Sequence, residues 1–197
     1  MSHHSQLSIK AEPQVLAPLS TLFQSGIQVT IDNDVALTDL LLSLPGFTLS
    51  YLGDAVQTIF VNGVPLDDMQ QPVQPGTTIA LSAAMPGLAG AIFRKQGLHG
   101  SLRSKPVALT KTSTATHTVR IKLFNSIATD RAQDLFTHGV VVDAKAMLSV
   151  LERRPDMFSH ADLELDSQGP VSLTQLKDHL STAQSVRLHV LVQPAKA

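Results

Sequence analysis

The sequence predicts an α+β fold of two tandem units that look like copies of one another. In both halves of the 197-residue chain, segments with strand patterning and segments with helix patterning follow one another in the same order. The halves also share an eight-residue signature, and a glycine-rich basic segment separates them. We therefore expect units at residues 7–84 and 117–193, joined by a connector at residues 85–116.

In the first unit, alternating polar and apolar residues predict strands, and apolar residues at helical spacing predict helices. The turn-forming pair Asn62-Gly63 separates two of the strand-type segments and predicts a tight turn. The expected strands are residues 6–11, 27–31, 56–61 and 77–82, and the expected helices are residues 13–24, 37–44 and 47–55.

The second unit repeats this succession. Asp143 is a suitable N-cap for a helix that Pro155 stops, because its short side chain can accept a hydrogen bond from the first helical turn. Residues 106–118 are rich in Thr, Ser, Ala and Lys, which favours a linker or a poorly packed strand. The other expected strands are residues 119–123, 140–142, 163–165 and 186–192, and the other expected helices are residues 128–137 and 173–180.

The signature that joins the halves is Leu-Phe-x-x-Gly-x-x-Val. It occurs at residues 22–29 and again at residues 135–142. Its glycines, Gly26 and Gly139, follow the expected helix ends, where a positive φ is common and glycine avoids the Cβ clash. We therefore predict that both glycines have positive φ and that the two halves superimpose.

Charge is distributed unevenly along the chain. Residues 69–129 contain no Asp or Glu but hold seven Arg and Lys, so the remainder carries 15 − 7 = 8 basic against 16 acidic residues. This segregation indicates either an anionic partner or an internal contact between oppositely charged surfaces. For the internal contact, the expected acidic partners are Asp67, Asp68, Asp162 and Glu164.

The glycine-rich basic segment supplies the candidate ligand-binding residues. Glycines let the backbone approach a ligand closely, cationic side chains can hold a phosphate or carboxylate, and a histidine can donate or accept a proton near neutral pH. The spacing matches neither a P-loop nor a dinucleotide-binding fingerprint. The candidates are Gly87, Gly90, Arg94, Lys95, Gly97, His99, Gly100 and Arg103.

One part of the first unit resembles a known family. The block Ile59-Phe60-Val61-Asn62-Gly63, followed by Pro75-Gly76 and a last strand, is similar to the C-terminal half of ubiquitin-like β-grasp sulfur carriers. These are the small subunit of molybdopterin synthase and the thiamine-pathway carrier. The resemblance covers about residues 27–90 and implies β-grasp-like units. It also implies carrier chemistry at a C-terminal Gly-Gly, whereas Gly87 and Gly90 are separated and internal. The wider pattern resembles bacterial proteins whose family implies no activity.

Composition limits the remaining possibilities. The chain has no cysteine, which excludes disulfides and thiolate sites and favours a cytoplasmic location. It has one Tyr and no Trp for stacking on bases, so nucleic acid is not an expected partner. No membrane segment, metal or cofactor is expected, and the oligomeric state stays open.

Three functions remain open. The first is a non-enzymatic binding module that contacts an anionic small molecule or a partner protein through the basic segment. The second is a ubiquitin-like sulfur carrier, or a precursor cleaved near Gly87 or Gly90. The third is an enzyme for a phosphorylated or carboxylated substrate that uses Arg94, His99 and Arg103.

Overall fold

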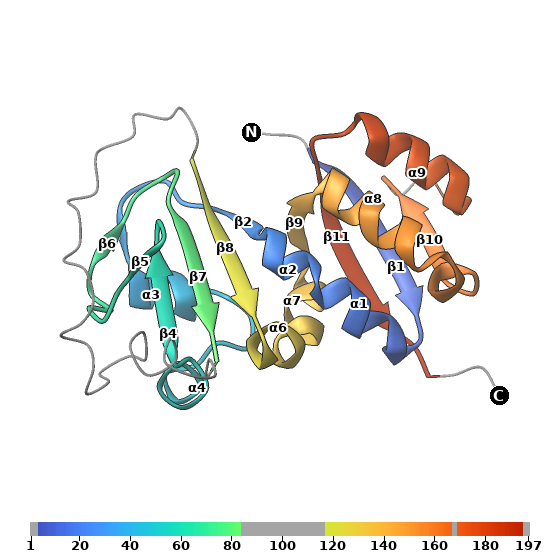
Figure 1. The fold of residues 1–197 in the computed structure, drawn as a ribbon. Helices are drawn as coiled ribbons and strands as arrows, with labels where there is room; N and C mark the ends of the chain where they lie inside the picture. The colour runs from blue at the N-terminus through green and yellow to red at the C-terminus, as the bar shows by residue number, and fades with distance from the viewer. Residues whose placement is uncertain (1–3, 84–116, 167–168, 195–197) are drawn as a thin grey trace. The chain divides into compact units, whose positions relative to one another are not determined.

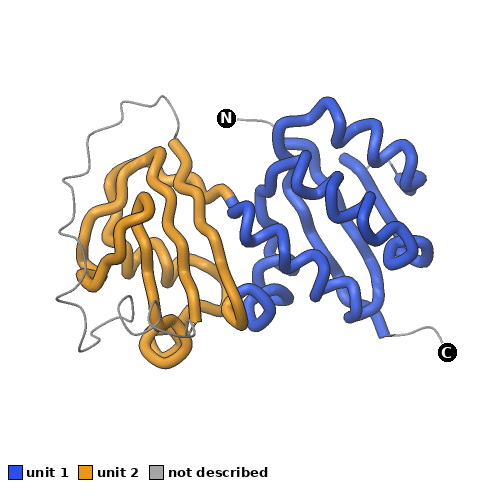
Figure 2. The backbone as a smooth tube through the Cα atoms, in the orientation of Figure 1, with its two compact units in different colours: residues 1–27, 128–197 blue, residues 28–127 orange. Residues whose placement is uncertain are grey.

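The protein folds into two compact units, one of which is built from both ends of the chain (Figure 2). A computed structural model describes residues 4–83, 117–166 and 169–194. Unit 1 contains residues 1–27 and 128–197, and unit 2 contains residues 28–127. The protein is of mixed α and β structure, as predicted. The unit boundaries differ from the predicted ones because the first strand of the chain pairs with the last.

The sheet of unit 1 is centred on two parallel strands. β1 (Ser5–Ala11) runs parallel to β11 (Ser185–Val192), with Leu7 opposite Leu188. β10 (Asp162–Leu165) flanks β1, and β9 (Val140–Asp143) flanks β11, each of them antiparallel to its neighbour. The sheet order is therefore β10-β1-β11-β9. One face of the central pair is fully buried, and it consists of Leu7, Ile9, Val186, Leu188 and Val190.

Helices cover this sheet, and Figure 1 shows α1 and α8 crossing in front of β1 and β11. The predicted first helix is divided into three short pieces, since Pro13 begins one and Pro18 interrupts the backbone donors that a single long helix would need. Asp143 caps α8 as predicted, because its Oδ1 accepts a hydrogen bond of 3.1 Å from the Ala146 N–H. The helices are η1 (Pro13–Val15), α1 (Leu16–Ser20), α2 (Leu22–Ser25), α7 (Ala132–His138), α8 (Ala144–Arg153), η3 (Pro155–Phe158) and α9 (Leu173–Thr182).

The two copies of the Leu-Phe signature meet in the core of unit 1. The rings of Phe23 and Phe136, one from each copy, stack with centroids 4.8 Å apart and are fully buried. The positive φ predicted for the following glycines is confirmed, at 104° for Gly26 and 82° for Gly139. The superposition of the two halves stays a prediction.

Unit 2 also has two parallel strands at the centre of its sheet. β7 (Thr78–Ser82) runs parallel to β8 (Thr118–Phe124), and β4 (Thr58–Val61) lies antiparallel to β7. β2 (Ile27–Thr30) follows β8 on one side and β5 (Val64–Pro65) follows β4 on the other, which gives the order β2-β8-β7-β4-β5. The apolar residues at alternate positions of β4, β7 and β8 are buried, as their period of two predicts.

The remaining elements of unit 2 are short. α3 (Leu37–Leu42) buries Leu37, Leu40 and Leu41, and Figure 1 shows it behind the strands. The predicted turn at Asn62-Gly63 is confirmed, since both residues have the positive φ that a two-residue hairpin turn requires, 50° and 81°. The other elements are β3 (Val35–Ala36), β6 (Pro72–Val73), which pairs with β3, α4 (Leu49–Asp54) and α6 (Ser126–Asp130), which contains the unit boundary.

Candidate functional site

The eight residues expected to bind a ligand lie outside the described residues. Gly87, Gly90, Arg94, Lys95, Gly97, His99, Gly100 and Arg103 all fall within residues 84–116. Two other cations of the acid-free interval, Arg120 and Lys122, are described, and both belong to β8.

Strand β8 sorts its side chains onto two faces. Its sequence, Thr-Val-Arg-Ile-Lys-Leu-Phe, alternates polar or aromatic residues with aliphatic ones. Val119, Ile121 and Leu123 are fully buried. The alternate positions Arg120, Lys122 and Phe124 are half-buried and therefore share the opposite face. We call this face, with its neighbours on β7 and β4, the outer face of unit 2.

The register fixes which residues are neighbours on this outer face. Across the parallel pair, Thr78 lies opposite Arg120, and Ala80 lies opposite Lys122. Ala80 also lies opposite Phe60 of β4, on its other side. The outer face thus places an aromatic ring and an ammonium group on either side of a residue that contributes only a methyl group.

No carboxylate belongs to the strands of this sheet. β2, β4, β5, β7 and β8 contain no Asp or Glu. Successive same-face residues of a strand are about 7 Å apart. The positive fields of Arg120 and Lys122 therefore add.

Polar groups lie at the carboxyl end of the parallel pair. Asn125 Nδ2 donates a hydrogen bond of 3.0 Å to the buried Ser82 Oγ, which ties the end of β8 to the end of β7. Asn125 has a φ of 55°, and this bond holds it in the left-handed conformation where the chain turns into α6. These contacts give the strand ends a fixed position.

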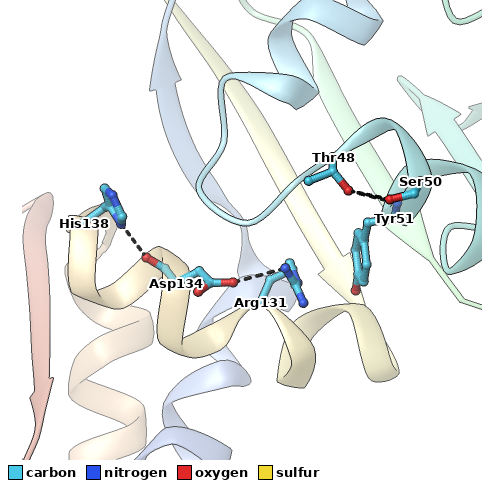
Figure 3. Close-up of polar contacts among 6 residues, drawn as sticks. All are labelled: Thr48, Ser50, Tyr51, Arg131, Asp134 and His138. Atoms are coloured by element: carbon cyan, nitrogen blue, oxygen red, sulfur yellow. Dashed lines mark hydrogen bonds and ion pairs between the residues drawn. The ribbon is translucent and has the colours of Figure 1, made fainter.

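In unit 1, by contrast, charged side chains pair within the unit. Lys10 Nζ lies 3.0 Å from Glu164 Oε1, so Glu164, one of the acids expected to meet the basic segment, forms an ion pair with β1. On α7, Arg131 Nη1 donates to Asp134 Oδ2 at 3.1 Å, and His138 Nδ1 lies 2.9 Å from the Asp134 carbonyl oxygen (Figure 3). These contacts are typical of a structural surface.

Helix α4 of unit 2 carries a polar N-terminus, also drawn in Figure 3. Thr48 Oγ1 accepts a hydrogen bond of 3.1 Å from the Tyr51 N–H and lies 3.0 Å from Ser50 Oγ. This is an ordinary helix cap, and it satisfies one of the backbone donors at the start of the helix. It therefore adds no candidate ligand group.

Arg120 and Lys122 belong to the acid-free interval but are not among the ligand-binding residues that the sequence predicts. The signal for them was present in the sequence: two cations separated by one apolar residue, in a strand with period-two patterning, must share a face. Phe60 stands out in the sequence only within the block that resembles the sulfur carriers. Its position opposite Ala80 depends on strand pairing, which no local pattern reveals.

The described residues contain neither a candidate metal-ligand group nor a helix that could cross a bilayer. Within the described ranges, no group of three or more His, Cys, Asp or Glu side chains is arranged to hold a metal ion. None of the described helices has the length and apolar content that crossing a bilayer requires. In comparisons with known proteins, no family model, curated protein or solved structure matches this chain.

Proposed function

We propose that this protein is a non-enzymatic binding module that contacts an anionic ligand or an acidic partner protein through its acid-free, basic part. The observation that carries the proposal is the outer face of unit 2. Arg120 and Lys122 lie there at alternate positions of β8, in a sheet whose strands hold no carboxylate.

Because the proposed binding depends on charge, it should act over long distances and should weaken as salt is added. Charges on a protein surface interact over about 8 Å at physiological ionic strength and over about 30 Å at 0.01 M. The cations of the glycine-rich segment, among them Arg94, Lys95 and Arg103, belong to the same acid-free interval and are part of the proposal by their sequence. An anionic partner would therefore meet up to seven positive charges.

The test is a titration of the full chain with poly-L-glutamate and with inorganic tripolyphosphate. Binding should weaken steadily as NaCl rises from 20 to 300 mM, about tenfold or more for several contacts. The double variant Arg94→Ala/Arg103→Ala should bind less while its melting temperature stays nearly unchanged. Lys145→Ala, at an exposed lysine of α8 in unit 1, is the matched control and should bind as the wild type does. If the chain binds neither of the two anions at 20 mM NaCl, the proposal is refuted.

The strand order of unit 2 supports the β-grasp fold that the resemblance to sulfur carriers implies. A β-grasp sheet has two parallel strands at its centre, and each is flanked by an antiparallel strand. Here β7 and β8 are the parallel pair and β4 lies antiparallel to β7. The Ile31 N–H donates to the His117 carbonyl oxygen at 2.9 Å, which places the end of β2 beside the start of β8 and makes this pair antiparallel as well.

This arrangement supports a β-grasp unit in which the first strand of the usual order comes last in sequence, as β8. A carrier function for such a unit would require the chain to end after β7, at Gly87 or Gly90. Intact-mass analysis of the protein from its native cells tests this second candidate. A species ending at either glycine supports it, and a full-length species alone contradicts it.

A further inference from the structure

We infer that Asn62-Gly63 is a deamidation site, which the folded unit 2 protects and which reacts when its turn opens. The two residues form the tight turn between β4 and β5, and both are exposed. Their positive φ values, 50° and 81°, are those of a two-residue hairpin turn. The site follows from the chemistry of this residue pair and from its contacts with β7, and it does not depend on the proposed function.

Deamidation at this pair requires no group beyond the turn itself and water. The Gly63 backbone nitrogen gives up its proton to solvent and attacks Cγ of the Asn62 carboxamide. The new C–N bond closes a succinimide ring, the Cγ–Nδ2 bond breaks, and Nδ2 takes up a proton and leaves as ammonia. Water then adds to one of the two ring carbonyls and reopens the ring, which leaves aspartate or isoaspartate at position 62. No electrons are gained or lost, so no oxidant or reductant is required.

The residue that follows Asn62 distinguishes it from the other asparagines of the chain. The sequence contains three asparagines, and Asn33 and Asn125 are followed by aspartate and serine. The side chains of those following residues obstruct the approach of the next backbone nitrogen to Cγ. Gly63 has no side chain and leaves that approach open. Asn62 is therefore the asparagine that should react first in the unfolded chain.

In the folded chain the Asn62 carboxamide is bound to the neighbouring strand β7. Its Oδ1 accepts a hydrogen bond of 2.8 Å from the Thr78 N–H, and the Asn62 N–H donates to the Thr78 carbonyl oxygen at 2.8 Å. These two bonds extend the antiparallel pairing of β4 and β7 one step beyond Val61, which lies opposite Ile79. The side-chain oxygen of Asn62 thus takes the place of the backbone oxygen that would complete such a pair.

These bonds oppose the first step of the reaction. Cγ must come within bonding distance of the Gly63 nitrogen, whereas the bond to the Thr78 N–H holds the carboxamide against β7. Releasing the carboxamide also leaves that N–H without its acceptor, which costs free energy. The turn must therefore open before the ring can close. The reaction rate of the folded chain is then the rate of the unfolded segment multiplied by the fraction of time that the turn is open.

The two products should affect the sheet differently. Aspartate at position 62 keeps an oxygen that can accept from the Thr78 N–H, whereas isoaspartate adds a methylene group to the main chain inside the turn. The added group disturbs the register of the hairpin, in which Val61 lies opposite Val64. Either product adds a negative charge beside strands that contain no Asp or Glu.

The test is incubation of the full chain at pH 8 and 37 °C, with and without 8 M urea, followed by peptide mapping. Asn62 should react about tenfold or more faster in urea than in buffer, and in urea faster than Asn33 and Asn125 of the same sample. A synthetic peptide of residues 58–66 is the unfolded reference and should react equally fast in both solutions. Labelling by an isoaspartate-specific methyltransferase identifies the rearranged product, and circular dichroism confirms that the chain in urea is unfolded.

The variant Thr78→Pro tests the bond itself, since proline has no backbone N–H to donate to Oδ1. Its Asn62 should react several-fold faster than that of wild type in buffer, whereas the matched control Thr78→Val keeps the donor and should react as wild type does. If Thr78→Pro does not fold, the comparison of wild type in buffer and in urea decides alone. Equal rates in those two solutions, earlier reaction of Asn33 or Asn125, or a folded Thr78→Pro that reacts no faster than Thr78→Val would overturn the inference.

Discussion

Unit 1 and unit 2 have the same arrangement at the centre of their sheets but differ in how charge is distributed on the polar face. In each unit two parallel strands, β1 with β11 and β7 with β8, are flanked by antiparallel strands. In unit 1 one cation of the polar face, Lys10, is paired with Glu164 of the neighbouring strand, and a second, Arg187 of β11, donates to the Gly139 carbonyl oxygen at 3.4 Å. In unit 2 the sheet strands contain no acid at all. The two units therefore share the layout of their sheets and differ in whether the sheet strands carry acidic residues.

The strongest test of this comparison removes the aromatic contact that joins the two chain segments of unit 1. Phe136→Ala should lower the free energy of unfolding by about 4 kcal/mol, because the ring is fully buried and its removal leaves a cavity beside Phe23. Amide hydrogen exchange should accelerate more in β1 and β11 than in β7 and β8. Equal acceleration in both units would mean that they unfold as one, against the comparison.

Substitution of Gly139 should lower the free energy of unfolding by a smaller amount, through one specific contact. An added Cβ would lie 2.2 Å from His189 Cε1, at a φ of 82°, so Gly139→Ala should cost about 3 kcal/mol. Gly63 in unit 2 has nearly the same φ, 81°, but nothing within 4 Å of the added carbon, so Gly63→Ala should cost only about 1 kcal/mol. Urea denaturation of both variants measures the difference.

The double variant Gly139→Ala/His189→Ala separates the two causes at Gly139. It should cost less than the sum of its single variants, since removing the imidazole removes the clash and leaves the backbone strain. Strict additivity would show that the ring and the glycine do not interact.

The sequence predicted most elements, together with the positive φ of both signature glycines, because helix spacing, strand alternation and turn residues act over a few neighbours. It could not predict that Ser5–Ala11 pairs with Ser185–Val192, since alternation in β1 specifies a buried face and not the strand beside it. The unit boundaries and the positions of Phe60, Ala80 and Lys122 opposite one another depend on such pairings. Arg120 and Lys122 could have been placed on one face from the sequence, whereas their neighbour Ala80 could not.

Helix caps should give effects of about 1 kcal/mol in either unit. Ser172 Oγ accepts from the Gln175 N–H at 3.2 Å, and Gln175 Oε1 accepts from the Ser172 N–H at 2.9 Å, which closes a capping box on the ten-residue α9. Thr48 caps the shorter α4 of unit 2 with a single bond to its backbone. Ser172→Ala should therefore cost at least as much as Thr48→Ala in thermal unfolding, and the reverse order would contradict the reciprocal bond.

The smallest stability effects are expected at the charges themselves. Lys10→Gln should cost about 0.5 kcal/mol or less, because roughly a third of each side chain in its ion pair with Glu164 is exposed, at 33% and 37%. Lys122→Gln should change stability by no more than about 0.5 kcal/mol, as is usual for substitutions away from the core. A loss of 2 kcal/mol or more in Lys122→Gln would show that this cation holds the fold.

The most direct test of the difference between the units is a nuclear magnetic resonance titration of the ¹⁵N-labelled full chain with poly-L-glutamate at low salt. If unit 2 offers its outer face to anions, the backbone amides of Ala80, Arg120 and Lys122 should shift progressively, and the shifts should disappear in 300 mM NaCl. The amides around Lys10 and Glu164 should stay in place, because that ion pair is already formed. Shifts confined to β1 and β10, with none in β7 and β8, would contradict the account.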